Sequence, residues 1–168
     1  VSYEEVRYEG YAPSGIAVLV ECTTDNRNRT VSEVRHAFTK YGGNLGSEGS
    51  VAYLFDKIGL LIFPPDMDED VVMEVAVEAG AQDVETGSDG TVEVITEPEK
   101  LNFVTDQMSA AGLLSELAEV VQRPTSETEL AGEDAEKVML LINALEDLDD
   151  VQDVFTNASF PEDMVFAS

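Results

Sequence analysis

Hydrophobic and polar positions alternate along two segments near the start of the chain, residues 3–11 and 15–24. A period of two predicts β-strands, and Pro13 and Gly15 between them favour a turn. In the second segment both sets of alternating positions between residues 16 and 20 are apolar. We therefore expect this strand to be buried on most of both faces.

The spacing of apolar residues then changes from a strand period to a helical one. Residues 30–33 read TVSE, which fits a capping box, so the helix is predicted to begin at Thr30. Gly42 and Gly43 predict its end, because glycine accepts the left-handed conformation that closes many helices. Residues 50–56 predict a further strand. The apolar face of the helix consists of Val31, Val34, Phe38 and Tyr41.

From residue 57 the pattern restarts and predicts a complete small domain. The expected order of elements is β-α-β-β-α-β, which is the ferredoxin-like arrangement. Its hairpin is signalled by Asp89-Gly90, a dipeptide that favours tight turns. The predicted elements are a strand at 60–63, a helix at 68–79, strands at 82–86 and 91–95, a helix from Pro98 to Ala111, and a strand at 113–121.

The last part of the chain supplies one more helix and strand, at 133–148 and 151–156, after a polar crossing segment at 123–132. Residues 1–56 alone lack these elements for a two-layer sandwich. The predicted fold class is therefore α+β, with two ferredoxin-like-type α/β sandwich domains, one inserted into the other. Residues 1–56 and 129–168 form the discontinuous domain, and residues 57–128 form the inserted one.

The net charge of −26 is distributed unevenly along the 168 residues. Residues 1–57 carry six Lys and Arg against eight acids, whereas residues 58–168 carry three against 27. Nucleic-acid affinity comes largely from basic groups that displace phosphate counterions. Any contact with DNA or RNA is therefore expected in residues 1–57, and the remaining acids are interpreted mainly as solvated, solubilising faces.

The candidate binding residues come from this first part of the chain. Guanidinium groups can bind phosphates bidentately, and tyrosines such as Tyr8 and Tyr11 can stack on unpaired bases. The alternative is that Arg27, Arg29 and Arg35 pair with acids such as Asp25 or Glu33 and only hold the loop. The tentative nucleic-acid-binding set is Arg7, Arg27, Asn28, Arg29, Arg35 and Lys40.

Catalytic, cofactor and metal sites find little support in the composition. One histidine, His36, and one cysteine, Cys22, cannot build the usual triads or zinc sites, so we predict no enzyme, no cofactor and no metal. The glycines of residues 42–49 follow a helix and precede a strand, the reverse of a phosphate-binding loop. The acids of residues 66–70 suit a helix start, and those of 146–150 are interpreted as a solvated helix end or a partner surface.

The chain shows no apolar run long enough for a membrane span and no secretory signal pattern. Its single Cys22 cannot form an internal disulfide and is interpreted as a packed side chain in a reducing compartment. We therefore expect a cytoplasmic protein without membrane contact.

Residues 24–55, TDNRNRTVSEVRHAFTKYGGNLGSEGSVAYLF, resemble the signature of the YebC/PmpR family, bacterial proteins with a mitochondrial relative that activates translation. Residues 7–11 and 144–152 match as well, so the resemblance covers essentially the whole chain. It implies the same discontinuous domain arrangement and a non-enzymatic regulator of gene expression. Members are described as DNA-binding transcriptional regulators or as translation factors at the ribosome.

The resemblance also implies a basic, helical N-terminal domain that nothing here matches, and the start at Val1 suggests a partial or processed chain. Expected partners are DNA or the ribosome, both its rRNA and its basic ribosomal proteins, with binding that needs the missing domain. The acidic composition favours the ribosome over free DNA. The alternative is a small-molecule-sensing or protein-interaction module without direct nucleic-acid binding.

Overall fold

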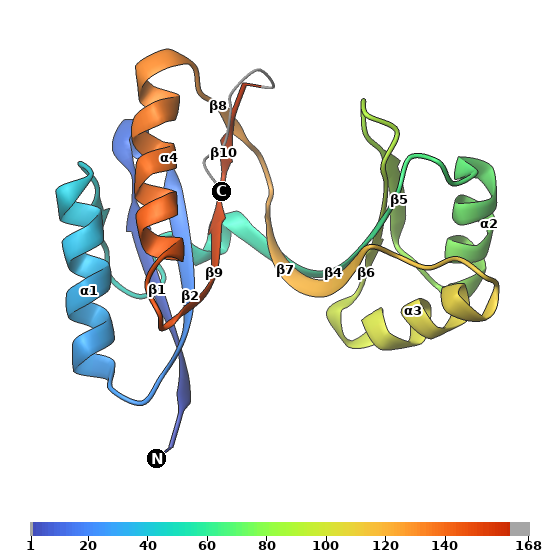
Figure 1. Cartoon of the computed structure of the whole chain (residues 1–168), viewed down its shortest axis with the longest axis horizontal. Helices are drawn as coiled ribbons and strands as arrows, with labels where there is room; N and C mark the ends of the chain where they lie inside the picture. The colour runs from blue at the N-terminus through green and yellow to red at the C-terminus, as the bar shows by residue number, and fades with distance from the viewer. Residues whose placement is uncertain (1, 162–168) are drawn as a thin grey trace. The chain divides into compact units, whose positions relative to one another are not determined.

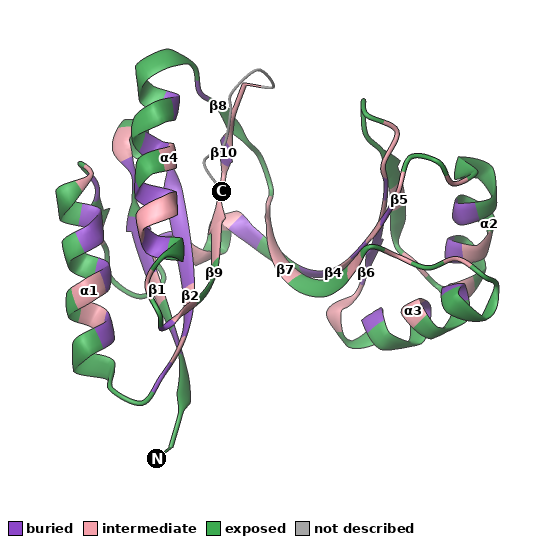
Figure 2. Cartoon of the chain, in the orientation of Figure 1, coloured by how far each residue is buried: buried purple, intermediate pink, exposed green. Residues whose placement is uncertain are grey.

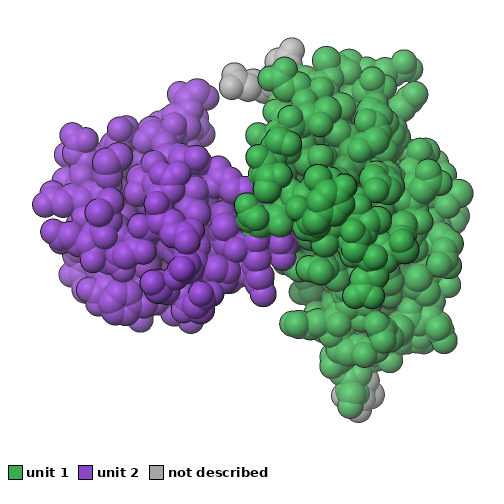
Figure 3. Space-filling model, turned by 180° about the vertical axis from the view of Figure 1, so that it is seen from behind, with its two compact units in different colours: residues 1–56, 124–168 green, residues 57–123 purple. Residues whose placement is uncertain are grey.

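The computed structural model describes residues 2–161. The chain divides into two compact units, coloured separately in Figure 3. Residues 1–56 and 124–168 form one, here called the outer unit, and residues 57–123 form the other, the inserted unit. The second boundary therefore lies after Arg123 and not after residue 128. The cause is that Thr125 N donates a hydrogen bond to Leu54 O at 2.9 Å, which ties the crossing segment to the outer unit.

The outer unit is a two-layer sandwich of one sheet and two helices. Its sheet has the order β3-β1-β2-β9, and β1 pairs antiparallel with β2 from Glu4↔Thr24 to Tyr11↔Ala17. The two helices cover the same face of this sheet (Figure 1). The elements are β1 (Glu4–Tyr11), β2 (Ala17–Thr24), α1 (Arg27–Lys40), β3 (Asn44–Leu45), α4 (Gly132–Glu146) and β9 (Val151–Thr156).

Strand β2 is the centre of the outer unit and is buried on both faces, as its sequence predicted (Figure 2). Val18 and Val20 point into the core beneath α1 and α4. Leu19, on the opposite face, packs with Val51 and Phe55. A strand with apolar side chains on both faces needs cover on both, and residues 51–55 supply the second layer.

The predicted strand at 50–56 is wrong for most of its length. Ala52–Leu54 form a 3₁₀ turn, and the strand begins only at Phe55. The carboxylate of Glu9 accepts hydrogen bonds from the backbone N–H groups of Gly49, Val51 and Ala52, at 2.7, 3.0 and 2.7 Å. These donors are satisfied by a side chain, so the segment has no need of a sheet partner.

The inserted unit has the ferredoxin-like order of elements, and its sheet has the strand order β5-β6-β4-β7. Helices α2 and α3 pack on a core that contains Leu61, Phe63, Val94 and Met108. The elements are β4 (Phe55–Phe63), α2 (Glu69–Ala79), β5 (Asp83–Thr86), β6 (Val92–Thr96), α3 (Leu101–Ala110) and β7 (Leu117–Pro124).

Two short strands complete the outer unit. β8 (Thr128–Glu129) lies in the predicted crossing segment and pairs in parallel with β10 (Ala158–Ser159). Within residues 2–161, no helix is long and apolar enough to cross a bilayer.

Cys22 supplies a test of the core. Burial, with the negative charges of Asp150 and Glu21, raises the pKa of this thiol to about 12, and its side chain is 2% exposed. The thiolate is the reactive form, so we expect the folded protein to react with an aromatic disulfide reagent only as fast as it opens. Absorbance would show slow labelling at neutral pH and fast labelling in denaturant. Fast labelling of the native protein would contradict the buried placement of β2.

Candidate nucleic-acid interface

The helix that carries most of the predicted binding residues begins earlier than its sequence indicated. Helix α1 starts at Arg27, and its N-cap is Asn26, whose Oδ1 accepts from Arg29 N at 3.1 Å. The predicted capping box at Thr30 is wrong, because Thr30 lies in the first helical turn and its hydroxyl contacts Asn26 O at 3.1 Å. Asn is a preferred N-cap residue, so Asn26 was the signal that the capping-box reading missed.

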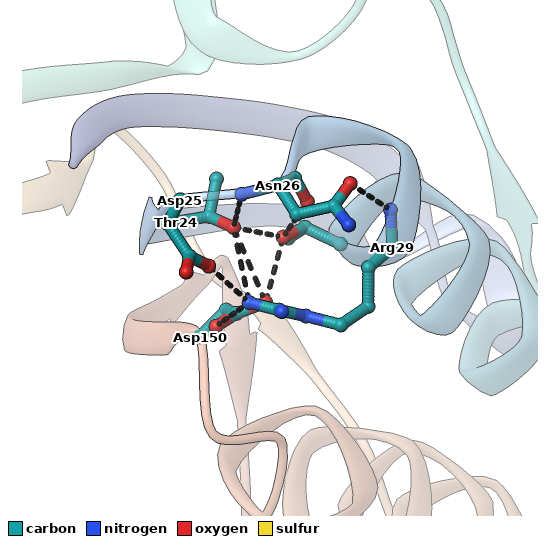
Figure 4. A network of polar contacts seen from close by, with 6 residues as sticks. Thr24, Asp25, Asn26, Arg29 and Asp150 are labelled. Carbon is teal, nitrogen blue, oxygen red and sulfur yellow. Dashed lines mark hydrogen bonds and ion pairs between the residues drawn. The ribbon is translucent and has the colours of Figure 1, made fainter. Parts of the chain in front are cut away.

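Thr30 is buried, and its hydroxyl belongs to a polar network centred on Asp150. Figure 4 shows Thr24 and Arg29 facing Asp150 in this network. Asp150 Oδ2 lies 2.7 Å from Thr30 Oγ1 and 3.4 Å from Thr24 Oγ1. Arg29 approaches the same carboxylate with two nitrogens, Nε at 3.2 Å from Oδ2 and Nη2 at 2.9 Å from Oδ1. This is the bidentate geometry of strong Arg–carboxylate pairs.

The charge of Asp150 is well matched by these partners. The Thr30 hydroxyl lowers the pKa of Asp150, burial acts in the opposite direction, and Arg29 lowers it further, so the net pKa is below its ordinary value. Only 9% of Asp150 is exposed. The interpretation of residues 146–150 as a solvated helix end is therefore wrong for Asp150.

Arg29 is largely committed to this network. Its Nη2 also lies 2.8 Å from Asp25 Oδ1, and the hydrogen bonds that the guanidinium donates to Asp25 and Asp150 raise its pKa. With Nε and Nη2 both engaged, Arg29 acts as a structural cross-link between α1 and the start of β9. Its predicted phosphate contact competes with two carboxylates.

Arg7 and Arg27, by contrast, both line one groove. A cavity of about 400 Å³ is lined by both arginines, with Tyr8 beside them. Arg27 Nε lies 3.5 Å from Glu4 Oε1, but both side chains are more than half exposed, so this pair stabilises the fold little. Glu5, Val6, Glu9, Gly46 and Glu48 complete the lining.

The groove follows an open strand edge. β1 pairs with β3 only at Gly10 and Tyr11, so residues 4–8 have no strand partner on that side within the described chain. Alternate residues of a strand point to opposite faces, so Arg7 and Tyr8 flank this edge from its two sides. An aromatic ring and two guanidinium groups lie beside this strand edge, together with the carboxylates of Glu5, Glu9 and Glu48.

The other predicted residues lie elsewhere on α1. Asn28 and Arg35 are exposed on the helix. Lys40 lies in its last turn, roughly 20 Å along the axis from Arg27 at 1.5 Å per residue. Its Nζ is 5.4 Å from the centroid of the Tyr41 ring. The six predicted residues therefore do not form one continuous surface, and their role in binding stays a prediction.

Glu9 is a structural residue that sequence reasoning missed. It is 3% exposed and receives the three backbone hydrogen bonds described above. Burial alone would raise the pKa of this carboxyl, but those N–H groups and the nearby charge of Arg7 together lower it. Glutamate at a strand position looks like a solvent-facing residue, so no local signal identified it.

Similar proteins were found by sequence and by structure. The family model for the TACO1/YebC second and third domain matches residues 3–158. The chain is 58% identical to a probable transcriptional regulatory protein of Herminiimonas arsenicoxydans over 94% of its length, and 53% identical to one of Nitrosococcus oceani over 98%. It spans 65% and 66% of the lengths of these two relatives.

A solved structure shares the fold. The crystal structure of a conserved hypothetical protein from Aquifex aeolicus matches with a TM-score of 0.86 at 47% identity. The match covers 97% of this chain and 68% of that one. The structure of residues 2–161 holds no group of three or more His, Cys, Asp and Glu side chains suited to a metal ion.

The Asp150 network predicts a large effect from a small change. Asp150→Asn removes the charge that Arg29 and two threonines bind, and we expect a loss of about 2–3 kcal/mol in the free energy of unfolding at neutral pH. The pKa of Asp150 is lower in the folded protein than in the unfolded chain. The stabilisation by its charge is therefore fully present at pH values above the unfolded pKa, and it is lost as the pH falls through the folded pKa. Urea denaturation at several pH values measures it. Asp149→Asn, at an exposed neighbour, should change stability by less than about 0.5 kcal/mol. Equal effects would contradict the network.

Glu9 gives a second, independent test. Glu9→Gln replaces one acceptor oxygen by an NH₂ group that faces backbone donors, so we expect a loss of about 2–3 kcal/mol. Because the pKa of Glu9 is lowered in the folded protein, its charge stabilises the fold at pH values above its unfolded pKa of about 4.3. This stabilisation declines as the solution becomes more acidic. The variant should therefore show a flatter acid limb in thermal melts. Glu5→Gln, two residues earlier and exposed, is the control, and the idea fails if it behaves the same way.

Proposed function

The chain belongs to the TACO1/YebC family, and from that premise we propose that it works as a non-enzymatic regulator of gene expression that contacts nucleic acid through its outer unit. The observation that carries this proposal is the groove that brings Arg7, Arg27 and Tyr8 together. Relatives at 53–58% identity are named probable transcriptional regulatory proteins, which supports the regulatory half of the proposal.

The distribution of ion pairs supports the choice of the outer unit. In the inserted unit, Lys100 and Arg123 pair with Glu97, Glu85 and Glu93. In the outer unit, Arg27 and Arg29 are the only basic residues that form ion pairs with acids among the described residues. Five Lys and Arg side chains have no carboxylate oxygen within 4 Å in residues 2–161: Arg7, Arg35, Lys40, Lys57 and Lys137. All of them except Lys57 belong to the outer unit.

The charge of the inserted unit favours the ribosome over a free DNA duplex. This unit has fifteen Asp and Glu against Lys57, Lys100 and Arg123, a net charge of −12. A phosphate backbone repels such a surface. A ribosome presents basic proteins beside RNA, so it offers partners for both units. The open edge of β1 and the Tyr8 ring suit a single-stranded RNA segment better than a duplex.

Ribosome co-sedimentation tests the proposal. We expect the contacts of the outer unit to let this chain pellet with ribosomes at low salt, more weakly than it would with the N-terminal domain that the resemblance implies, and we expect its release as salt rises. The double variant Arg7→Ala/Arg27→Ala should weaken binding at least about tenfold and lower the salt dependence by about two units of log–log slope.

The matched control removes the same charge from the inserted unit. Lys57→Ala/Lys100→Ala should leave ribosome binding close to that of the unaltered chain. If both double variants lose binding equally, only overall charge matters and the groove is not the contact. Sequence-specific binding to a promoter duplex, without co-sedimentation, would overturn the ribosomal assignment in favour of DNA.

A further inference from the structure

A second cavity lies at the opposite end of α1 from the Arg7–Arg27 groove. It measures about 390 Å³, within the range of small-molecule sites. Three parts of the outer unit contribute to it: the turn between β1 and β2, the end of α1 and the exposed side of α4. Its lining consists of Pro13, Lys40, Tyr41, Gly42, Lys137 and Leu140.

Two lysines and no acidic residue line this cavity. Lys40 comes from α1 and Lys137 from α4, and neither has an Asp or Glu oxygen within 4 Å in the described part of the chain. The protein carries 35 acids against nine bases. Two lysines without an ion-pair partner among the described residues therefore line one hollow of a strongly negative molecule.

The rest of the lining is apolar or aromatic. Leu140 is 53% exposed although it lies on a helix whose other large apolar side chains are mostly covered. Pro13 and the ring of Tyr41 form the neighbouring walls. An apolar wall beside two cations matches a ligand with an anionic group on a flat, largely apolar body.

We propose that this cavity binds a phosphate monoester carried by a nucleoside, as in a nucleoside 5′-monophosphate, either free or at the 5′ end of an RNA. The phosphate carries a charge of about −1.5 to −2 at neutral pH, which two lysines neutralise as point charges. The base packs against Leu140 and lies beside the Tyr41 ring, over which Lys40 Nζ stands at 5.4 Å from the centroid. This site is distinct from the groove proposed above to contact the nucleic-acid backbone.

Titration calorimetry with adenosine 5′-monophosphate, on the complete chain, tests the proposal. Lys40→Met and Lys137→Met each keep the aliphatic stem and remove the charge, and each should weaken binding about tenfold or more. Adenosine and inorganic phosphate, which each supply half of the ligand, should both bind at least about tenfold more weakly than the monophosphate. Lys100→Met, at an exposed lysine of the inserted unit, should leave binding unchanged.

The opposite results would overturn the site. One is monophosphate binding that survives both lysine variants, and another is binding of inorganic phosphate as tight as that of the nucleotide. The third is the absence of binding heat at an adenosine 5′-monophosphate concentration of about 10 mM, tenfold above a usual upper Km of about 1 mM. Arg7→Ala/Arg27→Ala should leave monophosphate binding intact, so this proposal and the ribosomal one fail separately.

A pair of RNA tetranucleotides distinguishes the two sources of the ligand. Tighter binding of the 5′-phosphorylated form than of the free monophosphate assigns the site to an RNA end, and equal or weaker binding assigns it to the free nucleotide. Equal binding of the 5′-hydroxyl and 5′-phosphorylated forms, with both lysines present, would overturn the proposal.

Discussion

The outer unit depends on the Asp150 carboxylate, because this group joins two parts of the chain that the inserted unit separates. Thr30 is 120 residues away from Asp150 in sequence and Arg29 is 121 away, yet all three share one set of hydrogen bonds. Backbone pairing between β2 and β9 runs alongside, and Thr23 N donates to Asp150 O at 2.9 Å. A discontinuous domain must hold its two segments in one register, and a buried, fully paired carboxylate is specific in a way that apolar packing is not.

Two buried acids of the outer unit, Glu9 and Asp150, are stabilised as charged groups by different kinds of partner. Asp150 is neutralised by a guanidinium and by hydroxyl groups, whereas Glu9 is held mainly by backbone N–H groups. A buried carboxylate without partners would destabilise the fold. In both cases the partners come from a loop or a helix start, so the carboxylate fixes the conformation of that segment. The net charge of −26 therefore includes a few acids that are part of the architecture, among many that are solvated.

Much of the fold could be predicted from sequence, because it follows from local periodicity. The two-sided burial of β2 is visible in its unbroken apolar run. Helix α2 begins close to the acids that indicated its start, and it ends at Gly80 as that glycine indicated. Three failures involve a partner that is far away in the sequence, a side chain in two cases and a backbone carbonyl in the third. Glu9 turns residues 49–52 away from a strand, Asp150 draws Thr30 inward, and Thr125 is fixed by Leu54. The candidate site was harder still, since only the fold shows that Arg29 faces Asp150 while Arg7 and Arg27 line the same groove.

The split of the outer unit has a consequence for synthesis. A ribosome releases the chain from its N-terminus, so β1, β2 and α1 emerge well before α4 and β9, the elements that cover them. The inserted unit is complete in the meantime and, as a contiguous segment with its own core, can fold first. Until α4 arrives, Val18, Val20 and Phe38 belong to an unfinished core. The segment translated after the inserted unit thus decides whether the strands translated before it reach their native state, and a truncation that removes α4 and β9 would damage β1 and β2 as severely as a mutation within them.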